Sequence, residues 1–292
     1  MANITAGMVK ELRERTSLGM MDCKRALTEA EGDMDKAIDD LRKASGIKAA
    51  KKASRVAAEG VVLTKIAEDG GYGAIIEVNS ETDFAARDDN FLDFSQQALE
   101  LAYSNREADV AALLGAGLED TRSALVQKIG ENCNLRRVER LQFTHENTGI
   151  VESYVHSNNR IAVLISVTGG EEALARDVAM HIAAVNPLVV RAEDVPKEEI
   201  AKETEIYSAQ ARESGKPEEI IEKMISGRLR KFVAEVSLLE QPFVKDPDVT
   251  VGKLLKDAGA SIVHFVRFEV GEGIEKEEID FADEVAAQVK GS

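Results

Sequence analysis

Two segments of the chain repeat one pattern, and this repeat limits the folds open to the chain more than any other feature. The segment "GVVLTKIAEDGGYGAIIEV" (Gly60 to Val78) aligns without a gap to "GIVESYVHSNNRIAVLISV" (Gly149 to Val167). Identical or similar residues coincide at Gly60/Gly149, Val61/Ile150, Val62/Val151, Thr64/Ser153, Ile66/Val155, Ile75/Leu164, Ile76/Ile165 and Val78/Val167. Each copy reads as a strand, a polar turn and a second, more apolar strand, which is typical of a β-hairpin.

A helical segment follows each of the two hairpins. Because one hairpin alone cannot bury its apolar side, we expect two related α+β subdomains, each a small antiparallel sheet that helices cover on one face. A chance similarity between two ordinary hairpins is the alternative.

The first 45 residues predict three short helices. The apolar positions are Met8, Val9 and Leu12 in the first, Cys23, Ala26 and Leu27 in the second, and Ala37, Ile38 and Leu41 in the third. Thr5 and Asp33 are suited to cap the first and third helices, and Gly32 to end the second. The following Ala-rich, basic stretch "KASGIKAAKKASRVAAEG" predicts a partly helical linker.

Met20 and Met21 fall between the first two helices, in the segment "TSLGMM". Adjacent positions on a turn cannot both face one small core, so we expect one of the two to face outward. The alternative is that both fill the core, since methionine is a common gap-filler as well as an adaptable contact residue.

The net charge of −16 is distributed unevenly. Residues 1–56 carry 12 Lys and Arg against 9 Asp and Glu, whereas the remainder carries 25 against 44. So acidic a body repels phosphate backbones, which disfavours direct nucleic-acid binding and favours a protein partner. No apolar run approaches the roughly 20 residues of a membrane span and no secretory signal is recognisable, so a cytoplasmic location is expected.

A long excursion in the second half is marked by two prolines, Pro196 and Pro217, with "SGKP" before the second helix. Its arms carry narrow apolar stripes, made by Ile200, Ile206 and Tyr207 and by Ile220, Ile221, Met224, Ile225, Phe232 and Val236. These stripes predict an antiparallel helical hairpin that projects from the body. The chain then returns through "QPFVKDP" to a strand, "SIVHFVRFEV", and to a final acidic helix from about Glu275 to Lys290.

Signatures of catalysis and of metal binding are missing from the sequence. Gly215-Lys216 and Gly252-Lys253 lack the Ser or Thr that follows in a phosphate-binding loop. Cys23 and Cys133 suggest neither a disulfide framework nor a zinc site, and we expect both to be small buried residues. The histidines, His145, His156, His181 and His264, fall on separate elements; His156, at a hairpin turn, is the one expected to be exposed. We therefore expect neither an enzyme nor a cofactor.

The stretch "NSETDFAARDDNF" (Asn79 to Phe91) allows two interpretations. In the first, Thr82 caps a helix, Asp83 is a first-turn acid near the positive end of the helix dipole, and Phe84, Phe91 and Phe94 form the buried stripe. In the second, Phe84 stands at the corner between strand and helix and fills a pocket of another protein.

Seven segments in order carry a resemblance that runs from residue 2 to about residue 289. They are "MVKELRERTSLGMMDCKRALTEAEGDMDKAI", "IKAAKKA", "EVNSETDF", "IGEN", "SGKP", "EVSLLEQPFV" and "RFEVGEGIEK". Together they resemble bacterial elongation factor Ts, a family of guanine-nucleotide exchange factors that release GDP from elongation factor Tu without covalent chemistry. The resemblance implies a ubiquitin-associated-like module, a two-subdomain core, a coiled-coil hairpin and a C-terminal module.

With the organisation above, the expected boundaries are 1–56 for the helical module and linker, 57–145 and 146–274 for the core subdomains, and 275–292 for the C-terminal module. The hairpin insertion covers 195–237. The implied partner is elongation factor Tu, GDP-bound or nucleotide-free; whether the hairpin joins two such complexes into a dimer is left open.

The resemblance also implies site residues. The family's Thr-Asp-Phe-Val motif, which dislocates Mg²⁺ from elongation factor Tu, matches Thr82, Asp83, Phe84 and Ala85, where Ala85 replaces the common valine. Partner contacts are implied for Lys10, Met20, Met21, Lys24 and His156. Around His156, "VHSNNRI" departs from the family's usual Tyr-x-His-Gly, which makes that contact less secure.

Two other classes of function remain as alternatives. One is an adaptor in which the N-terminal module alone binds the partner. The other is an enzyme with a site between the two subdomains.

Overall fold

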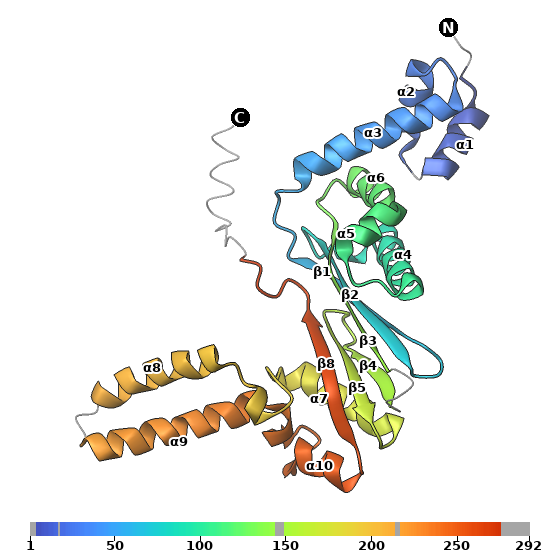
Figure 1. The fold of residues 1–292 in the computed structure, drawn as a ribbon. Helices are drawn as coiled ribbons and strands as arrows, with labels where there is room; N and C mark the ends of the chain where they lie inside the picture. Colours follow the sequence, from blue (N-terminus) through green and yellow to red (C-terminus); the bar gives the residue numbers. More distant parts are fainter. Residues whose placement is uncertain (1–3, 17, 144–148, 214–216, 276–292) are drawn as a thin grey trace.

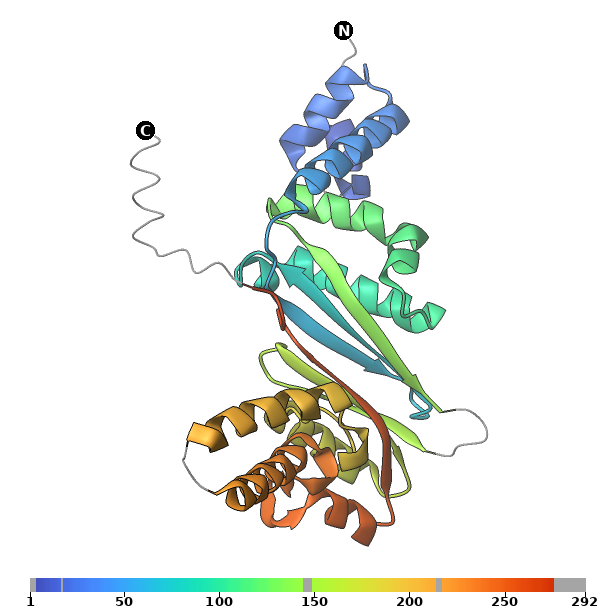
Figure 2. The same cartoon turned by 60° about the vertical axis from the view of Figure 1, so that its left-hand side comes forward.

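The computed structural model describes residues 4–16, 18–143, 149–213 and 217–275. It is an α+β fold, as predicted, and Figures 1 and 2 show an elongated molecule with the N-terminal helices at one end and a helical hairpin projecting near the other. Two three-stranded antiparallel sheets form its centre.

Both predicted hairpins are present, and each gains a third strand. The first sheet has the order β1 (Glu59–Ile66), β2 (Tyr72–Ser80), β3 (Asn134–Gln142). The second has the order β4 (Ile150–Val155), β5 (Ile161–Thr168), β8 (Ser261–Glu269). Strand β8 was predicted from the sequence, whereas β3 was not.

The two sheets are related by an approximate twofold symmetry that follows the sequence repeat. Val62 N–H donates to the carbonyl of Asn159, and its counterpart Val151 donates to the carbonyl of Gly70, which aligns with Asn159. The aligned hydroxyls of Thr64 and Ser153 lie 3.1 Å apart. Each sheet also has a register shift at the aligned steps Glu77/Val78 and Ser166/Val167. Chance similarity does not predict such reciprocal contacts, so the repeat is structural.

Three apolar layers hold this centre together. One lies between the sheets and contains Val62, Ile75, Val151, Ala162, Leu164, Phe268 and Val270. The outer face of the first sheet packs on α4 (Asp89–Asn105) and α6 (Glu119–Ile129), and that of the second on α7 (Glu172–Val185). The short α5 (Val110–Leu113) precedes α6. Because β2 and most of β5 are covered on both faces, they read as continuous apolar runs rather than as alternating strands.

The N-terminal helices are α1 (Ala6–Thr16), α2 (Met20–Glu29) and α3 (Met34–Lys52), around a core that includes Leu12, Cys23 and Leu27. Asp33 accepts a hydrogen bond from Lys36 N–H and caps α3, as predicted. The third helix is longer than predicted, because the basic stretch continues it to Lys52. This extension packs on α6, where the Ser45 hydroxyl donates to Gln127.

The helical hairpin consists of α8 (Lys197–Glu213) and α9 (Glu218–Val236), which pack against each other. After α9 the chain forms a small hairpin, β6 (Pro242–Phe243) and β7 (Asp246–Thr250), and then α10 (Val251–Asp257), none of which was predicted. His181 on α7 lies buried below this region, donating through Nε2 to Gln241 and accepting at Nδ1 from Val244 N–H. The predicted final helix, apart from Glu275, lies outside the described residues.

Excision of the hairpin should leave the core folded. The buried side chains of the two arms are Ala211 on α8 and Ile221 on α9, both of which lie within the hairpin. The end of α9 next to the core is held by a hydrogen bond from Leu188 N–H to the carbonyl of Val236. Replacing residues 199–232 by a short flexible linker is therefore expected to give soluble protein with an unchanged far-ultraviolet strand signal and a cooperative thermal transition. Loss of cooperativity would show that the arms stabilise the core.

Candidate functional site

A sharp corner joins β2 to α4 and carries the segment Thr82 to Ala85. Residues Ala85–Arg87 form one turn of 3-10 helix, and α4 starts only after it. Asp88 caps α4 by accepting from Asn90 N–H, and the hydrogen bond from the Asn90 side chain lowers the pKa of that carboxyl. Thr82 is therefore not the cap of this helix, and the first interpretation is wrong on that point.

Of the three phenylalanine rings in this region, two are buried and one is exposed. Phe91 and Phe94 are completely enclosed in the first core, as predicted. Phe84 is 80% exposed, while the following Ala85 and Ala86 are buried and anchor the turn. Asp83, beside the ring, accepts a hydrogen bond of 2.9 Å from Arg87. The corner thus presents an aromatic ring and a carboxylate to solvent, as the second interpretation predicts.

The two N-terminal methionines are exposed to solvent. Met20 and Met21 form the first turn of α2 and are 59% and 74% exposed, so the core-filling alternative is wrong for both. Lys10 and Lys24 are also exposed, and Lys10 lies 3.8 Å from Glu14.

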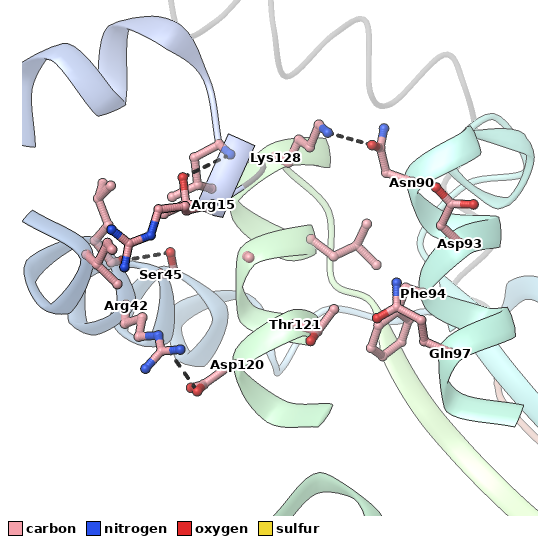
Figure 3. A pocket seen from close by; sticks show the side chains of 16 residues that line it. Arg15, Arg42, Ser45, Asn90, Asp93, Phe94, Gln97, Asp120, Thr121 and Lys128 are labelled. Atoms are coloured by element: carbon pink, nitrogen blue, oxygen red, sulfur yellow. Dashed lines mark hydrogen bonds and ion pairs between the residues drawn. The ribbon is translucent and has the colours of Figure 1, made fainter. Parts of the chain in front are cut away.

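Two cavities lie along α6 and share Lys128. One cavity of about 300 Å³ is lined by Met20 and Lys128 among others. A second, of about 330 Å³, lies between the N-terminal helices, α6 and α4, and Figure 3 shows Arg42 and Asp120 on one side and Asn90 and Asp93 on the other. Lys128 belongs to both and donates to Asn90 at the start of α4, as the dashed line in Figure 3 marks. The two cavities thus meet at Lys128, which contacts the first turn of the helix that follows the corner.

His156 lies at the β4–β5 turn, is exposed as predicted, and has its Nδ1 3.3 Å from the Tyr154 hydroxyl. This turn is tied to the same end of the first sheet as the corner. Arg160 of the turn forms an ion pair with Glu59, and Glu59 pairs with Ser80 at the end of β2. All predicted contact residues of the core thus lie at one end of the two sheets.

Sequence reasoning missed two residues that hold the corner, Glu131 and Asn132, in the segment "IGEN". The Glu131 carboxylate accepts from Thr82 N–H at 3.0 Å and from the Thr82 hydroxyl at 2.8 Å. The buried side-chain amide of Asn132 donates to the carbonyl of Arg55, in the linker after α3. The signal available was the motif itself, but its role depends on partners about fifty and eighty positions away.

Clusters that could hold a metal ion are missing from the part of the chain that the structure describes. No group of three or more His, Cys, Asp or Glu side chains there is placed to hold a metal ion. Within the same residues, no helix has the length and apolarity to cross a membrane. Both cysteines are buried and unpaired, and burial, more than the neighbouring charges of Glu131 and Glu81, raises the pKa of the Cys133 thiol to about 12.

The fold and this corner define an α+β protein whose candidate site is a projecting contact surface. The model of the elongation factor Ts family matches residues 81–272. The elongation factor Ts of Hahella chejuensis is 63% identical over 291 residues and that of Saccharophagus degradans 62% over 289, with 99% or more of each chain covered. That of Cellvibrio japonicus is 54% identical over 292 residues, covering 100% of this chain and 99% of the relative. The chain belongs to the elongation factor Ts family, and is thereby a translation elongation factor of protein biosynthesis.

Proposed function

We propose that this protein binds elongation factor Tu in its GDP-bound state, disrupts the Mg²⁺ and phosphate site, and promotes GDP release so that GTP can bind. The observation that carries the proposal is the exposed Phe84 beside Asp83 on a corner with buried anchors. Phe84 is the most exposed of the large apolar side chains in the part of the chain that the structure describes, and an aromatic ring in that position fits an anchor for a partner's pocket.

The mechanism is one of linkage and needs no covalent step. GDP and Mg²⁺ stabilise one conformation of the GTPase, whereas the exchange protein binds a conformation in which the nucleotide site is disrupted. By linkage, the exchange protein weakens the binding of GDP to the GTPase by the same ratio by which GDP weakens the binding of the exchange protein. In this scheme Phe84 fills an apolar pocket and supplies binding energy. Asp83 acts on the groups around the metal, with Thr82 and Ala85 holding the two in place.

The remaining site residues bind the partner away from the nucleotide. Met20, Met21 and Lys24 on α2, together with Lys10 on α1, contact its nucleotide-binding domain, and His156 contacts it from the second sheet. The proposed units are the helical module and linker (1–56), the two core subdomains (57–145 and 146–274) and a C-terminal module (275–292).

Release of fluorescent GDP from elongation factor Tu of the same organism tests the proposal. The factor is expected to accelerate release at sub-stoichiometric concentration, because exchange leaves it unchanged. An unaltered release rate at excess factor, with folded proteins on both sides, would refute the proposal.

The exposed methionines give a second test. Replacing Met20 and Met21 together by alanine is expected to weaken the complex by roughly 30-fold or more, since truncation of contact side chains costs upward of about 1 kcal/mol each at central positions. The melting temperature should change little, because neither side chain is buried. Isothermal titration with nucleotide-free partner and thermal unfolding measure the two effects; a large drop in melting temperature at unchanged affinity would contradict the contact role.

A further inference from the structure

The corner that carries Asp83 and Phe84 is held by a reciprocal pair of carboxylates. Glu131 follows α6 and accepts from the backbone N–H of Thr82 at 3.0 Å. In return Glu81, the residue before Thr82, accepts from the backbone N–H of Asn132, the residue after Glu131, at 2.5 Å. Each loop therefore binds the backbone of the other through a charged side chain, and we name these four residues the carboxylate clasp.

Further hydrogen bonds of Thr82 extend the clasp into the corner. The Thr82 hydroxyl donates to Glu131 at 2.8 Å and accepts from Ala85 N–H at 3.2 Å. The carbonyl of Thr82 accepts from the Ser80 hydroxyl at 2.9 Å. The N–H, carbonyl and hydroxyl of Thr82 are thus all engaged, immediately before the two residues that project into solvent.

The clasp also reaches the N-terminal helices. The Asn132 amide donates to the carbonyl of Arg55 at 2.8 Å, and the Arg55 guanidinium lies 3.5 Å from Glu81. The linker after α3 and the corner after β2 are therefore fixed to the same loop.

A fold does not need two carboxylates at this place. A neutral side chain such as glutamine could accept the same backbone N–H groups, and two like charges close to the buried Cys133 oppose one another. Charge-assisted hydrogen bonds are shorter and about twice as strong as neutral ones, and they restrict the corner more tightly. The two carboxylates therefore make the corner more rigid, at the cost of placing two like charges close together.

We propose that Glu131, with Glu81, is a positioning residue for nucleotide exchange: it acts through Thr82 to hold Asp83 and Phe84 in the projecting geometry that engages the partner. This rests on the proposed function. In this scheme the other contacts hold the initial complex, and the corner engages the nucleotide site in the step that releases GDP. Order in the corner therefore lowers the barrier of that step more than it strengthens the initial complex.

The test is the rate of GDP release at saturating factor, measured beside the factor concentration that gives half of that rate. Glu131→Ala is expected to lower the limiting rate by roughly tenfold or more, as displacement of positioned groups does, with the half-saturating concentration changed by less than about threefold. Glu131→Gln, which can accept from Thr82 N–H and donate to its hydroxyl but lacks the charge, should give a rate between those of the wild type and Glu131→Ala.

Glu119→Ala is the matched control. Glu119 is the first residue of α6, at the opposite end of the helix from Glu131, and its carboxylate accepts hydrogen bonds from Arg122 and Ser123. Arg122 in turn donates to the carbonyl of Cys133, so this network borders the clasp but is not bonded to Thr82. The control should lose stability and keep the limiting rate. If Glu131→Ala and Glu119→Ala lose similar stability and keep the same rate, the clasp is merely structural and the inference is wrong.

A double-mutant cycle addresses the route through Thr82. Thr82→Val keeps the shape of the side chain and removes the hydroxyl, and it remains informative if Glu131→Ala fails to fold. If Glu131 acts through Thr82, the combination with Glu131→Gln should be no slower than the slower single variant; additive losses would overturn the inference. If the wild-type protein does not accelerate GDP release, the proposed function is wrong. If Phe84→Ala slows release while Glu131→Ala and Thr82→Val do not, the proposed function stands and only the positioning role of Glu131 is wrong.

Discussion

Phe84→Ala is expected to slow GDP release from the partner by about 30-fold while leaving the fold intact. The ring is 80% exposed, so its truncation removes little buried area and should change the free energy of unfolding by about 0.5 kcal/mol or less. A ring that anchors an interface is worth about 2 kcal/mol or more on truncation, which corresponds to a factor of about 30 in rate or affinity. Chemical denaturation and stopped-flow GDP release measure the two quantities on the same protein.

Ile206→Ala provides the control for this comparison. Ile206 is 40% exposed on α8 of the helical hairpin, far from the corner, and its truncation should change neither stability nor exchange markedly. A Phe84→Ala protein that is destabilised by several kcal/mol, and that exchanges GDP at the wild-type rate once folded, would make the corner purely structural. The assignments of Asp83 and Phe84 would then be withdrawn.

The two central hairpins could be predicted because each is encoded by residues close together in the sequence, and because the same pattern occurs in two copies. Each hairpin has its own turn, and comparison of the two copies shows which residues belong to the shared pattern and which occur in one copy alone. Strand β3 escaped prediction because "NLRRVERLQ" presents only two buried apolar residues, Leu135 and Val138, among charged ones. Its arginines Arg136 and Arg137 are satisfied by Glu77, a partner about sixty positions away that no local pattern reveals.

The candidate site likewise contains residues whose position could be predicted from the sequence and residues whose position could not. The buried rings Phe91 and Phe94 follow helical spacing and were predictable, whereas the exposure of Phe84 depends on a single fact, that Asp88 rather than Thr82 caps α4. A one-turn 3-10 helix between strand and helix leaves no periodic signal. The resemblance to a known family pointed to Asp83 and Phe84, but Glu131 required the tertiary structure, since its contact joins two loops.

A buried carboxylate, Glu77, joins the two sheets at the end that carries the site. Its side chain has no exposed surface and lies at the register shift between β2 and β3. The carboxylate accepts from Arg136 and Arg137 on β3, from the Asn79 amide and, at 2.8 Å, from Gly271 N–H just beyond β8. The chain at Gly271 passes so close to Ala58 that a Cβ there would lie 2.3 Å from the Ala58 carbonyl oxygen. Glu77 therefore fixes the exit of β8 against the start of β1.

Glu77→Ala is expected to destabilise the protein by roughly 3 to 5 kcal/mol, as removal of one partner from a buried ionic cluster does. The substitution leaves two guanidinium groups without their shared carboxylate and Gly271 N–H without its acceptor. Urea denaturation at neutral pH measures the loss. Lys253→Ala, which breaks an exposed ion pair with Asp257 on α10, is the control and should change stability by less than about 1 kcal/mol.

The pH dependence of this stabilisation has a definite sign. Burial alone would raise the pKa of Glu77, but the hydrogen bonds from Gly271 and Asn79, the charge of Arg137 and the hydrogen bond from Arg136 outweigh it, so the pKa is lowered. A carboxyl whose pKa is lower in the folded state contributes its stability above the ordinary value of about 4.3 and loses it as the pH falls through the folded value. The difference in unfolding free energy between wild type and Glu77→Gln should therefore be constant from pH 7 to about 5 and shrink below about pH 4, where the wild-type carboxyl also becomes neutral. Because the other carboxyls titrate alike in both proteins, a difference that stays constant down to pH 3 would show that the ionised form of Glu77 is not what holds the two sheets together.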